Sequence, residues 1–438
     1  MDKSAGLLLE VVSPLIDERA GVIGQVHPLP LPRTYNSFMY GFAASVGRVE
    51  ALHPTRIALM SGQAVTGYGT ALEEPVARIR AVCEALERYC ALMHPTDGIM
   101  RATPRELGTG ALDVRRLPRC SVEERRRAAP ENRLHHPGPD EPIDWIRGYS
   151  LTERRPVMVP LTAIYLGLPL PLTKHVTFPM STGFAAGSSY NQAVLAALCE
   201  VVERDSLALW WLHQLPFPKV EIDTVELSSL HNLLERQRDM AVQTTLFDLT
   251  TDVGIPVIGI VQTSERHRPH VITMAACRTQ VAKAAQRVIE EAESLRIALS
   301  RAAAPVDREG VLRGDPHPAE SFGLLYSSPE GPARFSFALC AGTRSGLPRD
   351  WTDPDPLEAL VDRLRTLGME VIVVDVTLPE VHDFGIVVVR VLVPELMTLT
   401  FSHSIRYLAH PRLASAPEKL GFGSRTEATI TPDPIPYA

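Results

Sequence analysis

The chain has 438 residues, of which 45% are hydrophobic and 22% charged, as in a globular protein with two or three domains or one large α/β unit. Its net charge of −7 argues against a surface that coats nucleic acid, although a local anion site is compatible with it. The apolar runs are too short to span a bilayer, and the first residues lack the pattern of a signal peptide. Six cysteines without metal-binding spacing indicate reduced, mostly buried thiols, so we expect a cytoplasmic protein.

The first half of the chain predicts a mixture of strands and one long helix. Residues 1–34 predict an N-terminal arm or edge strand, and residues 35–438 predict one large domain. In chain order, the elements expected next are short strands at about 34–66, a turn at 67–70, a helix at 72–93 and a surface excursion at 100–142. Pro75 suits the first turn of that helix, because proline at this position loses no helical hydrogen bond.

The second half contains two segments with the same pattern, which is a strand, Asp-x-Thr, a glycine and another strand. The elements expected there are a glycine-bearing turn at 181–187, helices at about 190–213, 227–238, 280–300 and 357–367, the repeated segments at 246–261 and 373–393, a loop at 301–334 and a proline-rich tail at 431–438. This pattern predicts an α/β (α+β) chain with internally duplicated sheet and helix halves.

One helical motif, C-E-x-x-E-R, occurs twice, at residues 83–88 and 199–204. In each copy the two glutamates share a helix face, and the arginine follows the first glutamate by four positions, within reach of an ion pair. Such a face on a solvated helix would form only weak ion pairs. Apolar neighbours on the other faces indicate packed helices instead, where charge needs a partner. Four carboxylates and two guanidinium groups could together hold divalent cations and an anionic ligand.

The familiar nucleotide and hydrolase motifs are missing from the sequence, including the P-loop, the Rossmann fingerprint, the nucleophile elbow and H-E-x-x-H. His267 and His270 lie in a charged segment and predict surface residues rather than metal ligands. Glu291 and Arg296 add an acid and an arginine on the helix expected at 280–300. Alone they would form an ordinary solvated face, but beside the doubled motif they predict a third wall of one site.

These features resemble the YcaO superfamily, whose members are ATP-dependent enzymes that act on the peptide backbone, and the resemblance spans roughly residues 35–438. In that family an E-x-x-E-R helix occurs twice, the second after a segment like the one at 181–187 here. The resemblance implies a YcaO-type fold with an ATP site that lacks a Walker motif. The residues it assigns to ATP binding are Arg80, Glu84, Glu87, Arg88, Gln192, Glu200, Glu203, Arg204, Glu291 and Arg296.

The resemblance also implies how that site works. Mg²⁺ would be held by paired glutamates, Glu84 with Glu200 and Glu87 with Glu203, because hard cations prefer carboxylate oxygens. The arginines expected to contact phosphates or support these acids are Arg88, Arg204 and Arg296.

Pro432-x-Pro434-x-Pro436 at the end of the sequence resembles the proline-rich tail of YcaO members that form azolines. Alternating prolines favour an extended, pre-ordered tail, although proline-rich termini are also often disordered. The resemblance implies that the tail lies near the reaction centre, with Pro436 and Ala438 as catalytic residues.

The implied activity is ATP-dependent cyclodehydration of Cys, Ser or Thr residues in a ribosomally made precursor peptide, which yields thiazoline or oxazoline rings in natural-product biosynthesis. The enzymatic alternative is macrolactamidine or thioamide formation at the same site. The second alternative is a catalytically degenerate subunit that binds the peptide. The expected partners are the precursor peptide and a separate protein that binds its leader, with no nucleic acid and no membrane. The oligomeric state stays open, a homodimer included.

Four positions depart from the family pattern. Arg80 stands where serine is frequent, Gln63 where a basic residue is frequent, Thr182 where asparagine is common, and Gln192 where many members have glutamate. Arg80 could supply another phosphate contact or could fill the nucleotide pocket, and the second outcome would make the protein a scaffold. The intact glutamates and arginines of both motifs argue for activity.

Overall fold

The computed structural model describes residues 9–19, 21–31, 39–47, 65–95, 97–221, 230–302, 306–344 and 346–437. The chain forms two compact units, each assembled from separate segments. Unit 1 comprises Met1–Leu117, Leu134–Leu198 and Leu364–Pro394, and unit 2 comprises Pro118–Arg133, Cys199–Arg363 and Glu395–Ala438. Within the described ranges, no helix is both long enough and apolar enough to cross a membrane.

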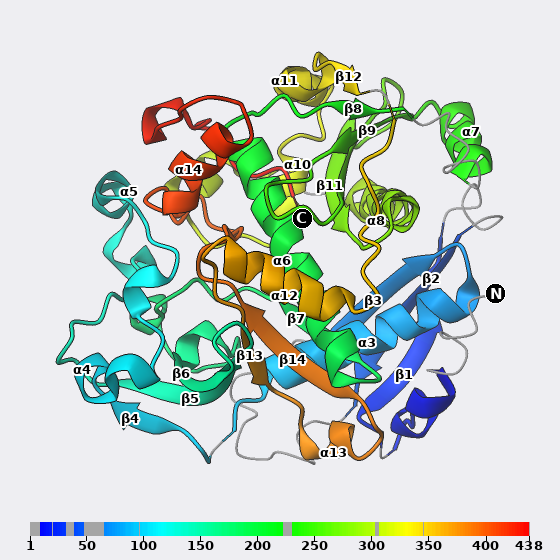
Figure 1. The fold of residues 1–438 in the computed structure, drawn as a ribbon. Helices are drawn as coiled ribbons and strands as arrows, with labels where there is room; N and C mark the ends of the chain where they lie inside the picture. The colour runs from blue at the N-terminus through cyan, green and yellow to red at the C-terminus, as the bar shows by residue number, and fades with distance from the viewer. Residues whose placement is uncertain are drawn as a thin grey trace. The chain divides into compact units, whose positions relative to one another are not determined.

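Unit 1 begins with a three-stranded antiparallel sheet, sheet A, whose strand order is β1-β2-β3. Its strands are Ile23–Pro28, Tyr40–Val46 and Thr66–Ala71. The described part of the expected N-terminal arm therefore supplies an edge strand. Helix α3 (Glu74–Leu92) packs along this sheet and begins with Pro75 in its first turn, as the sequence predicted (Figure 1).

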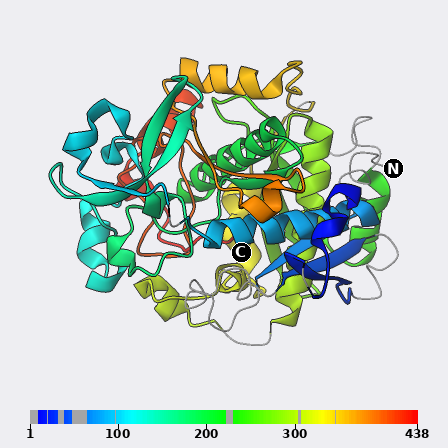
Figure 2. The same cartoon turned by 90° about the horizontal axis from the view of Figure 1, so that it is seen from below.

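Two glycines of β3 allow this close packing of α3 on sheet A. A methyl group on Gly67 would overlap the main chain of Ala81 and Ala85, and one on Gly69 would overlap that of Ala77. The turn expected at residues 67–70 was wrong, because these glycines belong to a strand and are required by the approach of the helix, not by a bend. Figure 2 shows the same helix along the blue strands from below.

The second sheet of unit 1, sheet B, is antiparallel and has the order β4-β5-β13-β14-β7, with β6 paired to β5. Its strands are Met100–Ala102, Ile143–Ser150, Arg155–Pro160, Phe184–Gly187, Ile372–Asp375 and Val387–Leu392. Strand β7 leads within two residues into helix α6 (Tyr190–Leu212). A methyl on Gly187 would crowd the main-chain nitrogen of Ala193, so this strand also meets its helix through glycine.

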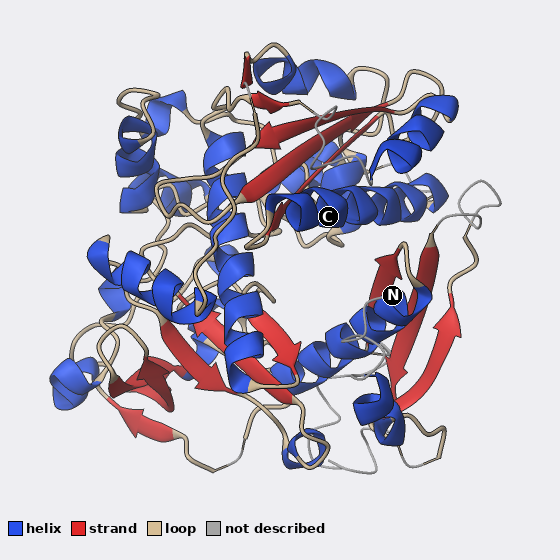
Figure 3. Cartoon of the chain, turned by 45° about the vertical axis from the view of Figure 1, so that its right-hand side comes forward, coloured by secondary structure: helices blue, strands red, loops and turns tan. Residues whose placement is uncertain are grey.

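Unit 2 is built on a five-stranded sheet, sheet C, with the order β11-β10-β9-β8-β12. Its strands are Lys219–Val220, Gln243–Asp248, Val257–Thr263, Val271–Cys277 and Thr343–Arg344. Helix α8 (Val281–Arg301) packs along β10 and β11 (Figure 3). The apolar stripe of α8 includes Val288, Ile289 and Ala292, all fully buried, as expected for a helix that packs one face on a sheet.

Other helices with both ends in the described part of the chain are α4 (Pro104–Leu107), α5 (Val122–Arg127), α7 (His231–Asp239), α9 (Arg308–Arg313), α10 (Glu320–Leu324), α11 (Ser336–Leu339), α12 (Pro356–Thr366), α13 (Pro379–His382) and α14 (Pro411–Lys419). The helices predicted at 72–93, 190–213, 280–300 and 357–367 are confirmed to within two residues at each end. The start of the helix predicted at 227–238 lies outside the described residues.

Two expected excursions are more ordered than the sequence suggested. The segment 100–142 contains α5, whose Glu124 is buried and accepts hydrogen bonds from the main-chain N–H groups of Arg406 and Leu408. The segment 301–334 contains short helices and the buried Phe322. The expectation of surface loops was wrong in these parts, because tertiary partners far away in the sequence cover short elements that have little periodicity of their own.

The repeated Asp-x-Thr pattern forms the same turn in both units. In each, the aspartate accepts a hydrogen bond from the threonine N–H, and the threonine hydroxyl accepts one from the next strand. These distances are 3.1 and 3.3 Å for Asp248, Thr250 and Val257, and 2.9 and 2.9 Å for Asp375, Thr377 and Val388. Gly254 and Gly385 both have positive φ, which only glycine adopts readily. The wider duplication of halves stays a prediction.

Candidate functional site

Both copies of the motif occupy the same position on their helices. Glu84 lies ten residues after the start of α3 (84 − 74 = 10), and Glu200 lies ten residues after the start of α6 (200 − 190 = 10). Each helix follows its glycine-bearing strand after two residues. In both copies a strand precedes the helix, and the motif lies at the same distance from the start of that helix.

In unit 1, the first glutamate is held by its own helix and by sheet A. Oε1 of Glu84 accepts a hydrogen bond from Arg88 Nη2 at 2.7 Å, and Oε2 accepts one from the main-chain N–H of Tyr68 at 2.5 Å. Arg88 also donates to the carbonyl of Thr66, and its guanidinium carbon lies 5.8 Å from the Tyr68 ring centroid. The side chain of Glu84 is 33% exposed, so its carboxylate is oriented yet accessible.

The second glutamate of this copy connects α3 to sheet B. Oε1 of Glu87 accepts a hydrogen bond from the N–H of Ala186 in β7 at 2.8 Å.

The structure describes two of the positions that depart from the family pattern near this motif. Arg80 Nη1 donates to the carbonyl of Thr70 at 2.6 Å, so its side chain runs back along β3. Gln63 lies outside the described residues. Gln192 accepts hydrogen bonds from Ser188 through its Oε1 and so orders the start of α6.

In unit 2, the second copy has the same local arrangement but is more deeply buried. Arg204 Nη2 lies 3.3 Å from Oε1 of Glu200 and 3.5 Å from Oε1 of Glu203. Oε2 of Glu203 accepts a hydrogen bond from the N–H of Cys277, at the end of β11, at 3.2 Å. Glu203 is only 6% exposed. One arginine therefore serves a buried carboxylate and a partly exposed one.

The electrostatics of this cluster fit a bound cation. Burial raises the pKa of Glu203 to about 7; Arg204 opposes that rise, while Glu291 and Glu200 add to it. Burial lowers the pKa of Arg204, but Glu203 and Glu200 more than offset this, so the guanidinium stays charged. A buried carboxyl whose pKa is raised by neighbouring acids is one whose ionised form a hard divalent cation would favour.

The described residues of each motif supply only a few of the ligands that a metal ion needs. Among the residues with described positions, no group of three or more His, Cys, Asp or Glu side chains could hold a metal ion. Mg²⁺ takes few protein carboxylates and retains water or phosphate oxygens as its other ligands. A pair of glutamates in each motif therefore suits Mg²⁺ that arrives with a polyphosphate better than a free ion.

Sequence reasoning missed Arg278, which lies directly after β11. Its Nη1 donates to the Cys277 carbonyl at 2.6 Å. Burial lowers its pKa, and the charges of Glu291 and Glu203 raise it overall, which places this guanidinium beside the same acids. No motif marks Arg278. Arg287 was also missed, although its spacing of four from Glu291, with which it pairs at 2.5 Å, could have revealed it.

Arg296 lies in a separate buried network of α8. It is 4% exposed, donates to the carbonyl of Pro269 at 2.8 Å, and donates to Oε1 of Gln262 at 3.2 and 3.3 Å. Gln262 in turn donates to Glu293 at 2.9 Å. These contacts connect α8 to the β10–β11 hairpin. The phosphate role implied for Arg296 stays a prediction.

The tail is packed in unit 2. Residues 431 and 433–437 are buried, Pro436 among them, whereas Ala438 lies outside the described residues. Thr431 N–H donates to the carbonyl of Leu212 at 2.9 Å, and the Tyr437 hydroxyl donates to that of Leu207 at 3.3 Å. The alternative of a disordered tail is wrong for residues 431–437. The catalytic roles of Pro436 and Ala438 stay predictions.

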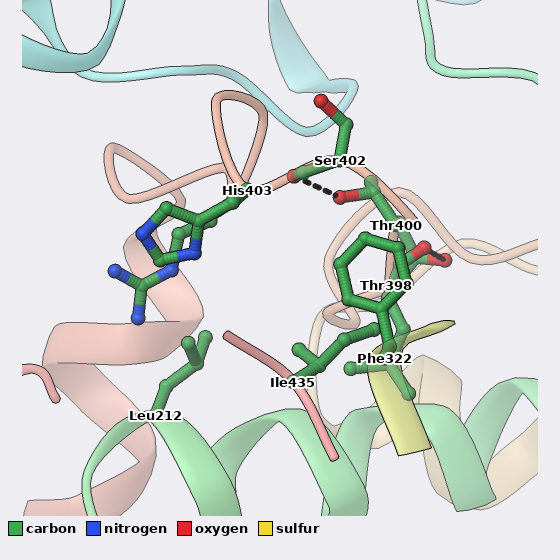
Figure 4. A pocket seen from close by; sticks show the side chains of 9 residues that line it. Leu212, Phe322, Thr398, Thr400, Ser402, His403 and Ile435 are labelled. Carbon is green, nitrogen blue, oxygen red and sulfur yellow. Dashed lines mark hydrogen bonds between the residues drawn. The ribbon is translucent and has the colours of Figure 1, made fainter. Parts of the chain in front are cut away.

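A small cavity of about 20 Å³ lies beside the tail in unit 2. In Figure 4, His403 stands to the left of it and Thr400 to the right, with Leu212 and Ile435 below. It has room for about one water molecule and is far too small for a nucleotide. Burial and, second to it, the charge of Arg406 lower the pKa of His403 to about 4. The cavity is thus part of the seat of the tail and not a nucleotide site.

Comparison with known proteins identifies one family. A family model described as YcaO cyclodehydratase, ATP- and Mg²⁺-binding, matches residues 67–397. An uncharacterised protein of Methanothermobacter thermautotrophicus is 28% identical over 335 residues, which cover 73% of this chain and 78% of that protein. An uncharacterised protein encoded in the tfuA 3′ region of Rhizobium leguminosarum bv. trifolii is 27% identical over 246 residues, 52% of this chain and 54% of that protein.

Solved structures share the fold at low sequence identity. A heterocyclase in complex with substrate and cofactor matches with a TM-score of 0.80 at 22% identity, covering 99% of this chain but only 57% of the heterocyclase chain. A YcaO protein of Methanopyrus kandleri, bound with AMPPCP and Mg²⁺, matches with a TM-score of 0.64 at 20% identity and covers 93% of each chain. The α/β fold of YcaO type that the sequence predicted is confirmed.

Proposed function

Because this chain belongs to the YcaO family of ATP- and Mg²⁺-binding cyclodehydratases, we propose that it converts Cys, Ser or Thr residues of a precursor peptide to azolines. The observation that carries this proposal is the doubled motif, in which each first glutamate pairs with its arginine and each second glutamate accepts a strand N–H. Charges on a solvated helix face need no such partners, so the same contacts in both copies indicate a shared function.

The glutamates would bind Mg²⁺, and the arginines would bind phosphate. The proposed magnesium ligands are Glu84, Glu87, Glu200 and Glu203. Bound Mg²⁺ supplies charge neutralisation at the phosphates of ATP. Arg88 and Arg204 each pair with a carboxylate of their own motif, which fixes the orientation of a planar guanidinium that could also bind a phosphate oxygen. Arg278 adds a further, partly buried cation to the second motif.

The reaction removes one molecule of water from the peptide. A thiol or hydroxyl of the peptide adds to the preceding backbone carbonyl carbon, and the carbonyl oxygen then takes the γ-phosphoryl group of ATP. That oxygen leaves as inorganic phosphate while the C=N bond forms and the amide proton is lost. ADP and phosphate are the other products. Phosphorylation is needed because an amide oxygen is a poor leaving group, and charge develops on groups that Arg and Mg²⁺ can stabilise.

Two measurements test this function in order. Titration of the purified chain with a non-hydrolysable ATP analogue and Mg²⁺ should show binding that Glu203→Gln and Glu84→Gln both weaken at least about tenfold. With a Cys-, Ser- and Thr-rich precursor peptide encoded beside its gene, the protein should hydrolyse ATP only when peptide is present. Loss of one water per modified residue would identify an azoline, and exchange of oxygen for sulfur would identify a thioamide.

The outcome also separates the alternatives. Binding without peptide-dependent hydrolysis, after a leader-binding partner has been supplied, would show a peptide-binding subunit in place of an enzyme. A ring closed by an amine with the same loss of water would show macrolactamidine formation. Lack of nucleotide binding by the intact chain would remove the proposed function altogether.

A further inference from the structure

The tail runs back along the last turns of α6. Thr431 bonds to the carbonyl of Leu212, the carbonyl of Asp433 accepts a hydrogen bond from Trp211 Nε1 at 3.4 Å, and Tyr437 bonds to the carbonyl of Leu207. As the residue number of the tail rises, that of its helix partner falls. The next turn of the helix in this direction carries Glu203 and Arg204. The tail is thus directed toward the second motif.

Tyr437, the last described residue of the tail, lies near Arg204. Its side chain is 2% exposed, and burial raises the pKa of its hydroxyl while the charge of Arg204 lowers it, so the two groups are close enough to interact electrostatically. Leu207, whose carbonyl accepts the hydroxyl, lies one helical turn from Arg204. The position of Tyr437 therefore couples the tail to a residue of the proposed ATP site.

The proline pattern leaves the register of the tail weakly specified by its main chain. Pro432, Pro434 and Pro436 have no N–H groups, so every second residue cannot donate a hydrogen bond. An extended segment of this kind could shift along an apolar surface at little cost unless a directional contact holds it. Beyond the main-chain bond of Thr431 to Leu212, the register therefore depends on contacts with side chains.

Asp433 supplies the directional contact. Its Oδ1 accepts a hydrogen bond from Arg308 Nη2 at 3.0 Å, and its Oδ2 accepts one from Arg334 Nη1 at 3.1 Å. The Asp433 side chain is 11% exposed, so both ion pairs are shielded at the carboxylate end. One residue further on, the Tyr326 hydroxyl donates to the carbonyl of Pro434 at 2.5 Å. Two guanidinium groups thus hold Asp433, and the hydroxyl of Tyr326 holds the next residue, Pro434.

We propose that Asp433 is the positioning residue of the tail: clamped by Arg308 and Arg334, it sets the register that brings Tyr437 to Arg204 and so supports turnover at the ATP site. This proposal rests on the proposed function for its effect on catalysis. Asp433 acts through the tail and does not itself reach the nucleotide. Its carboxylate is needed as a charge with two oxygens, because each oxygen accepts from a different arginine.

The test uses the full-length chain and the variants Asp433→Asn and Asp433→Glu. Asp433→Asn keeps the shape but loses the charge. We expect hydrogen exchange of the amides at 433, 435 and 437 to accelerate at least about tenfold, because the tail opens locally while the unit stays folded. The kcat for ATP hydrolysis should fall about 10- to 100-fold with KM for ATP within about twofold, since misplacement affects the reacting geometry more than nucleotide binding.

Conservative and control variants make the result specific. Asp433→Glu retains a carboxylate and should recover a large part of kcat and of tail protection. Asp315→Asn, which removes the exposed pair with Arg313 at 2.8 Å in the same unit, should change neither. A melting temperature unchanged in Asp433→Asn would show that the fold is intact.

Several outcomes would overturn the proposal. Unchanged tail protection in Asp433→Asn would show that the clamp does not hold the register, whatever the activity. Faster exchange with unchanged kcat would show that the register does not matter for turnover. If the wild-type chain neither binds nor hydrolyses ATP, the proposed function fails, and the exchange experiment still decides whether Asp433 holds the tail.

Discussion

The main-chain N–H of Cys277 donates a hydrogen bond to Oε2 of Glu203 at 3.2 Å. The second glutamate of the other motif, Glu87, is held in the same way by the N–H of Ala186 at 2.8 Å. In both copies a strand end thus orients a carboxylate that the helix alone would leave free to rotate. A strand N–H fixes the orientation of the carboxylate without adding a formal charge to the site.

Replacement of Glu203 by glutamine should separate stability from function. The variant keeps an oxygen for the N–H of Cys277 and removes a buried carboxyl whose pKa is raised to about 7, so the free energy of unfolding should change by less than about 1 kcal/mol or increase. ATP turnover should fall at least about 100-fold. Urea unfolding and a phosphate-release assay measure the two effects. Turnover near the wild-type rate would contradict the assignment of Glu203 to the site.

Replacement of Glu84 by glutamine tests the first motif against a matched surface pair. Glu84 and Arg88 are partly exposed, so loss of their ion pair should cost at most about 1 kcal/mol of folding stability. Affinity for the ATP analogue with Mg²⁺ should fall at least about tenfold. Glu74→Gln breaks the i,i+4 pair with Arg78 on the same helix and should leave affinity unchanged. If both variants lowered the affinity equally in calorimetric titration, nucleotide binding would depend only on the net charge of the helix and not on Glu84 itself.

Gly67→Ala tests the packing that positions the first motif. The added methyl would overlap main-chain atoms of Ala81 and Ala85, so we expect a loss of about 2–3 kcal/mol in the free energy of unfolding. Gly110→Ala is the control, because no atom lies within 4 Å of the added methyl. Its effect should be neutral or slightly stabilising, through a less flexible unfolded chain. Denaturant unfolding of both variants checks the contrast, and a neutral Gly67→Ala would refute the close approach of β3 and α3.

His403 should make folding stability depend on pH below neutrality. Its pKa falls from 6.5 to about 4 on folding, through burial and then the charge of Arg406, while Asp433 opposes the fall and Arg308 adds to it. Between pH 4 and 6.5, the His403 imidazole is therefore protonated in the unfolded chain and neutral in the folded chain. This contribution to stability, at most about 3 kcal/mol, is present above pH 6.5 and is lost as the pH falls toward 4.

The measurement for His403 is the free energy of unfolding across that pH window. His403→Asn should show a flatter dependence than wild type between pH 6.5 and 4. Replacement of the exposed His267 by asparagine should retain the wild-type slope. If His403→Asn and wild type have the same slope, the imidazole titrates normally in the folded state and the burial argument is wrong.

Much of the architecture could be predicted from local pattern. The long helices have strong apolar periodicity, and their ends were placed to within two residues. The Asp-x-Thr turns were visible as a repeat, because the hydrogen bonds that form them connect residues close in sequence. The excursions at 100–142 and 301–334 were misjudged. Glu124 and Phe322 are buried by contacts within unit 2 that leave no short-range trace.

By itself the sequence determined which helices carry acids and arginines and that the two copies are alike, because helical spacing fixes which side chains share a face. Only the tertiary structure decided what those residues meet. It placed Arg278 beside Glu203 and Glu291, and it turned Gly67 and Gly69 from an expected bend into a contact surface for α3. It also showed the tail bound along α6 through Asp433 and Tyr437. These contacts join residues distant in the chain, where packing and burial decide the partner and no sequence period records it.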